Sequence, residues 1–243
     1  MEDFEMMSAA AREKGLKIIM DFVPNHSSEE HDWFLASEAR QEPYTDYYIW
    51  RDRNESNPGG LPNNWLSVFR GSAWEWSETR GQFYYHAFTK EQPDLNYRNP
   101  AIRQEMIHIL NFWIDKGVDG FRMDAVPFLF EDPSLRDEPV SGKTDDPEDY
   151  NYLSHIYTWN FPEVKTVLAE LTEFVHVKTG GSGVVMLGQS FQARSRSDQQ
   201  TFISEALSED LTTEDMMTFY NCSDFPFNFN LIVNLKADNL SGK

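Results

Sequence analysis

The sequence predicts an α/β fold built around a parallel sheet. Helical segments alternate with short apolar strands along the 243 residues, which is the pattern that helix-covered parallel sheets produce. The first of these strands is nearly all apolar, as expected for a strand buried on both faces. Polar clusters follow three of the predicted strands. Composition and spacing leave open whether the sheet closes into a barrel or stays open.

The N-terminal element is a helix predicted over residues 2–14, where apolar side chains recur at helical spacing. Gly15 is expected to end it, since glycine readily adopts the left-handed conformation common after a helix. Residues 16–23 form the first predicted strand. Pro24 ends this strand because proline has no N–H to donate to a neighbouring strand.

Residues 27–100 have few periodic runs and many turn residues, so we expect an irregular insertion. It packs through aromatic side chains, among them Trp33, Trp50, Trp65, Trp74 and Trp76. Three further α/β units are predicted after it, each a helix followed by a turn or strand: 101–115 with 117–124, 161–178 with 184–187, and 198–220 with 225–232.

The composition excludes several classes of protein. A formal net charge of -19 repels phosphate backbones, so we expect no nucleic-acid partner. Cys222 is the single cysteine, which excludes a disulfide framework and disfavours a zinc site. No run approaches the roughly 20 apolar residues that cross a bilayer, and the acidic N-terminus has no signal-peptide pattern. We therefore expect a soluble chain without an export signal.

Polar clusters lie where three strands are predicted to end: 21–26, 120–124 and 188–191. Active sites of parallel barrels are assembled at these carboxyl ends. Arg122 and Asp124 are two residues apart, so on a strand both side chains point to the same face. An adjacent arginine keeps a carboxylate ionised, as a nucleophile requires. A structural salt bridge explains the pair equally well.

Three motifs resemble those of the α-amylase superfamily, glycoside hydrolase family 13. Residues 21–26 (Asp-Phe-Val-Pro-Asn-His) resemble its third-strand motif, and residues 120–124 (Gly-Phe-Arg-Met-Asp) resemble its nucleophile motif on the fourth strand. Residues 92–96 (Gln-Pro-Asp-Leu-Asn) resemble the insertion motif of the oligo-1,6-glucosidase and maltase branch. Four further stretches look most like insect maltases: 64–69, 71–76, 153–157 and 225–229.

This resemblance implies a partial (β/α)8 TIM barrel, covering about strands three to six, with an insertion domain after strand three. Residues 1–26 and 101–243 are expected to form the partial catalytic barrel, and residues 27–100 the insertion domain. The chain is expected to be an internal fragment, since the first two and last two strands of the barrel have no counterpart in it.

The resemblance also assigns roles to individual residues. Asp124 matches the nucleophile that forms the glycosyl-enzyme, and Arg122 the residue that orients and ionises it. His26 matches a ligand for sugar hydroxyls, and Asp21 a buried partner that shapes the site. Retaining glycosidases also need a protonated carboxyl group about 5 Å from the nucleophile. Gln189 stands where that acid is expected, and an amide has no proton to give near neutral pH.

Neighbouring departures at Gly188 and Phe191, where the family has Thr and Tyr, indicate that the whole acid motif has drifted. We therefore expect no glycosidase activity from this chain. No cofactor is expected. No metal is expected either, because the calcium loop of many relatives lies before Met1.

Three interpretations remain open. The chain resembles an α-glucosidase (maltase) that releases glucose from maltose- or sucrose-type sugars by a retaining mechanism, with a small-molecule sugar as its partner. Alternatively, it is a non-catalytic homologue that binds sugar or protein, as the heavy chains of amino-acid transporters do. A third interpretation is a partial gene product without a folded function. The resemblance implies an extracellular location, although the chain has no signal peptide of its own.

Overall fold

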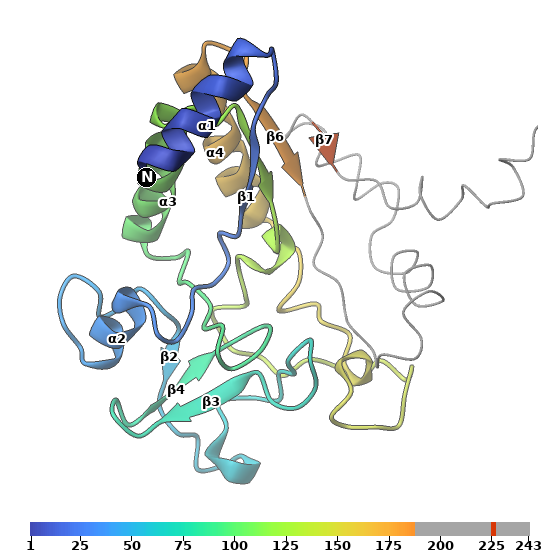
Figure 1. Ribbon diagram of the computed structural model, residues 1–243. Coiled ribbons are helices and arrows are strands. Elements are labelled where there is room, and N and C mark those ends of the chain that lie inside the picture. Colours follow the sequence, from blue (N-terminus) through green and yellow to red (C-terminus); the bar gives the residue numbers. More distant parts are fainter. Residues whose placement is uncertain (188–224, 227–243) are drawn as a thin grey trace, which may run out of the picture.

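A parallel sheet carries its strands in the order in which they occur along the chain. The computed structural model describes residues 1–187 and 225–226. Within them β1 (Ile19–Phe22), β5 (Gly120–Met123), β6 (Val184–Leu187) and β7 (Phe225–Pro226) form one sheet in that order (Figure 1). All three strand pairs are parallel. A doubly wound sheet reverses its strand order, whereas a (β/α)8 barrel keeps it, so this order favours the barrel.

Three helices accompany this sheet and confirm the predicted alternation: α1 (Glu2–Glu13), α3 (Pro100–Asp115) and α4 (Glu163–Thr179). They lie close together beside the strands (Figure 1). α3 begins where Asn99 accepts a hydrogen bond from the backbone N–H of Ala101 at 3.0 Å. α4 ends at Gly180, whose φ of 66° places it in the left-handed region that glycine tolerates. The predicted helix over 198–220 lies outside the described residues.

The core lies between the parallel sheet and these helices. α3 contributes Ile102, Met106 and Leu110, which lie four residues apart and therefore on one face of the helix. Burying each such side chain contributes about 1.5–3 kcal/mol, so this face holds α3 against the sheet. Their main partners are buried residues of the strands and of α4: Phe22, Phe121, Met123, Val185, Leu187, Val164, Val167, Leu168, Leu171 and Val175.

β1 departs from the expected burial on both faces. The strand is shorter than the predicted 16–23, and the Ile19 side chain is 42% exposed. β1 stands at the end of the strand order, so one of its edges has no strand partner among the residues described. The apolar run therefore predicted the strand correctly, but the prediction that both of its faces are buried was wrong.

Residues 27–100 are more regular than predicted. They contain a three-stranded antiparallel sheet in the order β2-β4-β3, which lies below the parallel sheet in Figure 1. These strands are two to four residues long, too short for an alternating pattern to stand out in the sequence. The elements of this segment are α2 (Asp32–Glu38), β2 (Trp50–Arg51), a 3₁₀ turn (Pro58–Gly60), β3 (Trp74–Ser77) and β4 (Gln82–Tyr85).

Aromatic side chains hold this small sheet together, as the composition predicted. Trp74 lies opposite Tyr85 and Trp76 opposite Phe83 across β3 and β4. Trp65 stacks on Trp74 with ring centroids 5.9 Å apart. Aromatic pairs of this kind add about 0.5–1.5 kcal/mol beyond their buried area, which compensates for the shortness of the strands.

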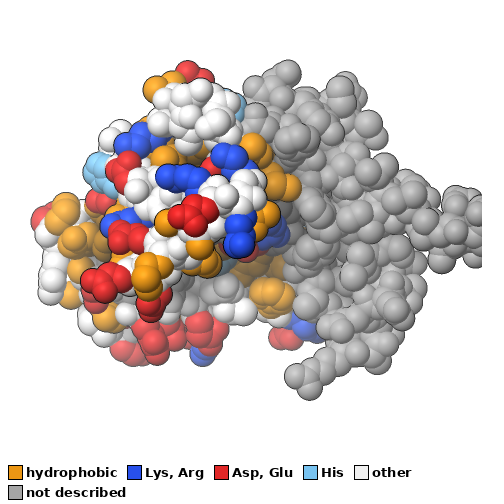
Figure 2. Space-filling model, turned by 45° about the horizontal axis from the view of Figure 1, so that its top comes forward, with side chains coloured by type: hydrophobic (Ala, Val, Ile, Leu, Met, Phe, Trp, Pro, Cys, Tyr) orange, Lys and Arg blue, Asp and Glu red, His pale blue; other side chains and the backbone are white. Residues whose placement is uncertain are grey.

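Figure 2 shows one face of the molecule, on which acidic side chains gather mostly toward the lower rim of the described part and lysine and arginine lie nearer its centre. In the part of the chain that the structure describes, no helix has the length and apolar character needed to cross a membrane.

Candidate active site

Two of the predicted polar clusters meet at the carboxyl ends of β1 and β5. The strands pair in register with Asp21 beside Arg122, and the backbone N–H of Asp124 donates to the carbonyl of Phe22 at 3.0 Å. The Arg122 guanidinium bridges two carboxylates: Nη1 lies 2.7 Å from Asp21 Oδ1, and Nη2 lies 3.2 Å from Asp124 Oδ1. The structure thus brings Asp21, Arg122 and Asp124 into one ion-paired group.

Gly120 allows β1, β5 and β6 to approach closely beneath this group. A Cβ atom at position 120 would lie 2.4 Å from the carbonyl oxygen of Val184 and 2.9 Å from Ile19 Cδ1. No larger residue fits there without moving the strands. The glycine that opens the motif at 120–124 therefore sets the spacing of the strands that carry Asp21 and Arg122.

The chain turns sharply directly after Asp124. Ala125 has φ 56° and ψ 19°, a left-handed conformation that is strained for a residue with a side chain. A 3₁₀ turn (Val126–Phe128) follows. The backbone N–H of Ala125 bonds to the Asp124 carboxylate and stabilises its ionised form. Strained backbone of this kind is often found at functional sites, where it fixes the direction of one side chain.

Burial opposes the effect of Arg122 that the sequence predicted for Asp124. Partial burial raises the pKa of Asp124 above its ordinary value, and the nearby Asp21 charge raises it further. Arg122 and the N–H of Ala125 lower that pKa, as expected for the ion pair, but they do not outweigh the burial. The pKa of Arg122 itself is raised, chiefly by its hydrogen bond to Asp21.

Asp21 is not the buried partner that the resemblance implied. Its side chain is 61% exposed because it projects from β1, the strand at the end of the order in which the described strands lie. Its contact with Arg122 is therefore an exposed ion pair, which typically contributes about 0–1 kcal/mol. Asp21 still shares Arg122 with Asp124, so it retains a role in holding the guanidinium.

His26 belongs to a second, buried group that joins the end of β1 to the motif at 92–96. Asn25 Nδ2 donates to Asp94 Oδ2 at 2.8 Å, and the N–H of Ala87 donates to Asp94 Oδ1 at 2.9 Å. The N–H of Leu95 donates to the carbonyl of Asn25 at 2.8 Å. Asn25 and Asp94 are 1% and 2% exposed. Two motifs that lie 69 residues apart in the sequence thus form one buried hydrogen-bonded unit.

The hydrogen bonds around His26 define its protonation. Thr89 donates its hydroxyl to Gln92 Oε1 at 3.1 Å, which turns the Gln92 amide nitrogen toward His26. That nitrogen lies 3.0 Å from His26 Nε2, so Nε2 accepts and the ring is neutral. Burial lowers the pKa of His26 to about 4, which agrees with a neutral ring. A sugar hydroxyl that binds Nε2 would have to replace Gln92.

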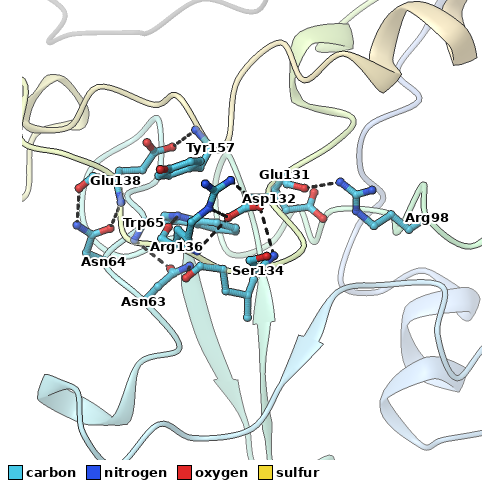
Figure 3. A network of polar contacts seen from close by, with 11 residues as sticks. Asn63, Asn64, Trp65, Arg98, Glu131, Asp132, Ser134, Arg136, Glu138 and Tyr157 are labelled. Atoms are coloured by element: carbon cyan, nitrogen blue, oxygen red, sulfur yellow. Dashed lines mark hydrogen bonds and ion pairs between the residues drawn. The ribbon is translucent and has the colours of Figure 1, made fainter.

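The loop that follows Asp124 is tied to residues 27–100 by a polar network (Figure 3). Asn64 makes two hydrogen bonds with the backbone of Glu138, accepting from its N–H at 2.8 Å and donating to its carbonyl at 2.9 Å. Trp65 Nε1 donates to the carbonyl of Arg136 at 2.9 Å. The Glu138 carboxylate in turn accepts from the N–H of Tyr157 at 2.7 Å, which holds both ends of the loop together.

Comparison with known proteins now decides the family. Residues 1–231 match the family model described as the catalytic domain of α-amylase. The chain belongs to the α-amylase family. Its parallel sheet is therefore part of a TIM barrel, which settles the alternative that composition left open.

Curated relatives place it near the insect maltases of the α-amylase family. It is 44% identical to Maltase 1 of Drosophila virilis over 98% of this chain and 36% of the relative. It is also 44% identical to a salivary α-glucosidase of Anopheles gambiae, over 98% of this chain and 39% of the relative. The human amino acid transporter heavy chain SLC3A1 is 52% identical, over 65% of this chain and 23% of the relative. The chain thus spans less than two fifths of the length of these relatives.

A solved structure that is similar to this chain in sequence has the same fold. The trehalulose synthase MutB of Pseudomonas mesoacidophila superposes with a TM-score of 0.70 at 32% identity, covering 95% of this chain and 37% of that one. The third predicted cluster, including Gln189, lies outside the described residues.

Sequence reasoning missed two buried carboxyl groups with a raised pKa in the loop after β5 of this α-amylase family chain. Burial raises the pKa of Glu131 to about 7, although Arg98 and Arg51 oppose the shift. Burial also raises the pKa of Glu138. Both residues lie in the loop after β5, where no periodic pattern marks them. Their burial follows from contacts with residues 27–100, which the sequence does not reveal.

The described residues contain no group of three or more His, Cys, Asp or Glu side chains placed to hold a metal ion. Two buried oxygen-bearing groups come closest. Asn25 Oδ1 has no hydrogen-bond partner, and burial raises the pKa of the neighbouring Asp94 well above its usual range. These atoms are suited to a hard cation and not to a soft metal.

Proposed function

We propose that this site takes the glucosyl unit of an α-linked sugar such as maltose, with Asp124 as the nucleophile of a retaining mechanism. The observation that carries the proposal is the bridge of Arg122 to Asp21 and Asp124 at the carboxyl ends of β1 and β5. Such a bridge directs one carboxylate oxygen of Asp124 and favours its ionised form. The maltase and α-glucosidase relatives support the choice of sugar.

The retaining mechanism lacks the proton donor that the departure of the leaving group requires. In a retaining glycosidase, the nucleophile attacks the anomeric carbon while a carboxylic acid protonates the departing oxygen. Gln189 occupies the position of that acid in the sequence. An amide can donate a hydrogen bond to the glycosidic oxygen but cannot transfer a proton. The chain therefore binds maltose without releasing glucose.

Glucose release from maltose tests this proposal. We expect none from the purified chain and a measurable gain in the Gln189→Glu variant. The Gln189→Glu/Asp124→Asn double variant is the matched control and should lose that gain. Steady glucose release by the unmodified chain, abolished by Asp124→Asn, would refute the inactivity of the chain and leave the nucleophile assignment intact.

A second candidate function is that of a non-catalytic heavy chain. The 52% identity to the transporter heavy chain SLC3A1, over 158 residues, favours it. This function requires the fold and its surface but neither Asp124 nor an acid at position 189. Co-purification of an integral-membrane partner that survives Asp124→Asn would support this candidate, and recovery of the chain without such a partner would count against it.

We infer the domain division on related grounds. Residues 1–26 and 101–243 form the partial barrel, and residues 27–100 form the insertion domain. The assignment is supported by the antiparallel sheet, whose three strands all lie within 27–100, while the parallel strands all lie outside it. The similarity to a salivary α-glucosidase supports an extracellular location. Proteolysis that releases residues 27–100 as a stable piece would support the boundaries.

A further inference from the structure

A cavity lies in the loop between β5 and α4, apart from the residues of the proposed nucleophile site. Its volume is about 320 Å³, and its lining includes Ser141, Tyr150, Asn151, Ser154, His155 and Trp159. None of these residues belongs to the groups around Asp124 or His26. Ligand pockets usually span roughly 300–1,000 Å³, so this cavity has room for a small molecule and not for a polymer chain.

One wall of the cavity is aromatic and rigid. The His155 ring stacks on Tyr150 with centroids 3.5 Å apart and an interplanar angle of 9°. His155 Nε2 lies 2.6 Å from the carbonyl of Tyr150, and burial lowers the pKa of His155 to about 4. The ring is therefore neutral and fixed in place. Trp159, which also lines the cavity, packs edge-on against Phe128 with centroids 4.7 Å apart.

The polar groups of the lining are suited to hydroxyl groups. The side-chain amide of Asn151 and the hydroxyl of Ser154 make no hydrogen bond to any part of the chain that the structure describes. The backbone of Asn151 is nevertheless fixed, because its N–H donates to Asp149 Oδ1 at 2.9 Å and its carbonyl accepts from the Ser141 hydroxyl. The side-chain amide on this backbone can pair with a ligand hydroxyl as both donor and acceptor.

The lining contains no carboxylate, and Lys143 is its one charged member. Aromatic rings beside an amide and hydroxyl groups match the two sides of a sugar, whose C–H faces are apolar and whose edges carry hydroxyls. A small neutral saccharide satisfies both sets of groups at once. An aromatic ligand would leave the amide and hydroxyl groups unpaired, which costs binding free energy.

The cavity is also connected to the proposed active site by packed rings. The Trp159 ring packs against Phe128. The ring centroids of Phe128 and Phe88 are 4.9 Å apart, and those of Phe88 and His26 are 5.2 Å apart. We infer that this cavity is an accessory binding site for a glucose-sized saccharide, separate from the Asp124 site. The inference goes beyond the proposed function and does not require Asp124 to act.

Maltose is the probe, and the readout is local. The chain is labelled with ¹⁵N-tryptophan, and the indole N–H signal of Trp159 is assigned from its absence in Trp159→Phe. We expect maltose to shift this signal in a saturable way. Asn151→Ala should raise the apparent Kd roughly tenfold, as expected for one lost hydrogen bond to the ligand. Asn54→Ala, which removes an exposed amide that is not part of the cavity lining, should leave the Kd unchanged.

The Asp124→Asn variant decides between this site and the active site. In Asp124→Asn the Trp159 titration should be unchanged, because the cavity does not include Asp124. The inference is overturned if maltose leaves the Trp159 signal unmoved, or if Asn151→Ala and Ser154→Ala both titrate as the unmodified chain does. Loss of the titration in Asp124→Asn would also overturn it, since the signal would then report the active site. The nucleophile proposal is tested separately, by whether a sugar becomes covalently attached to Asp124.

Discussion

Two polar groups at the end of β1, one containing Asp21 and the other Asn25, are held by different forces. The Asp21–Arg122–Asp124 group is charged and partly exposed, with Asp21 61% exposed. The Asn25–Asp94 group, a few residues further on, is buried and held by hydrogen bonds to backbone and amide donors. Exposed ion pairs stabilise a fold little, whereas an unpaired buried polar group destabilises it strongly. The first group is thus free to serve chemistry, and the second fixes the chain.

The largest expected effect comes from breaking the buried group. Asp94→Ala removes the acceptor for Asn25 Nδ2 and for the N–H of Ala87, leaving both donors buried and unpaired. We expect the free energy of unfolding to fall by about 3–5 kcal/mol. Asp94→Asn, which keeps one oxygen, should lose less. Denaturant unfolding measures both, and a loss below about 1 kcal/mol for Asp94→Ala would contradict the contrast between the groups.

The second expected effect concerns pH. Burial raises the pKa of Glu131 from its ordinary 4.5 to about 7. Between these values the folded chain holds a proton that the unfolded chain has lost, so stability falls as pH rises from about 4.5 to 7 and is constant above. The loss is at most about 3 kcal/mol. His26 acts in the opposite direction, since its pKa is lowered to about 4 and its contribution is lost as pH falls below 6.5.

Glu131→Gln isolates the carboxyl group from the histidine. The amide keeps the size of the side chain and cannot titrate, so the unmodified chain and the variant should differ in their unfolding free energies by an amount that grows from pH 4.5 to 7. A difference that is constant across this range would show that Glu131 keeps an ordinary pKa in the folded chain.

A smaller effect is expected at the network of Figure 3. Asn64→Ala removes two hydrogen bonds to the backbone of Glu138 and should cost about 1–2 kcal/mol. Asn57→Ala is the matched control, because Asn57 also makes two backbone hydrogen bonds, both within residues 27–100. Hydrogen exchange should speed up at residues 131–138 in Asn64→Ala alone. Equal protection in both variants would mean that Asn64 does not hold the loop.

The smallest stability effect is expected at Asp21. Asp21→Asn removes an exposed ion pair with Arg122 and should change the free energy of unfolding by about 0–1 kcal/mol. The pKa of Asp124 should fall slightly, since the Asp21 charge raises it. A carbon-detected NMR titration of Asp124 measures this shift. A stability loss comparable to that of Asp94→Ala would erase the distinction between the two groups.

The sequence predicted the barrel elements well because their signals are local. α3 repeats apolar residues every four positions, and its observed bounds of Pro100–Asp115 agree with the predicted 101–115 to within one residue. β6 was predicted over 184–187 because four apolar residues follow a glycine-rich turn. The antiparallel sheet was missed because its strands depend on cross-strand aromatic pairs that are visible only after folding.

The sequence predicted which residues form the site but not how they are arranged. The motifs located Asp21, Arg122 and Asp124, and the two-residue spacing placed the last two together. Nothing in the sequence indicated that Asp21 would be exposed on β1, or that the Gln92 amide would hydrogen-bond to Nε2 of His26. Such features depend on which segments cover a strand, and that is a property of tertiary packing.

The identity of the nucleophile is tested most directly by trapping sugar on the protein. With α-glucosyl fluoride, the Asp124 carboxylate attacks the anomeric carbon, the carbon–fluorine bond breaks, and fluoride leaves with the bonding electrons. This leaving group needs no proton, so the amide at 189 does not prevent the step, but it cannot activate water to release the sugar. Peptide mass spectrometry should therefore find one hexosyl unit on Asp124, and none in Asp124→Asn. An unmodified Asp124, or a hexosyl unit on another residue, would contradict its role as the nucleophile.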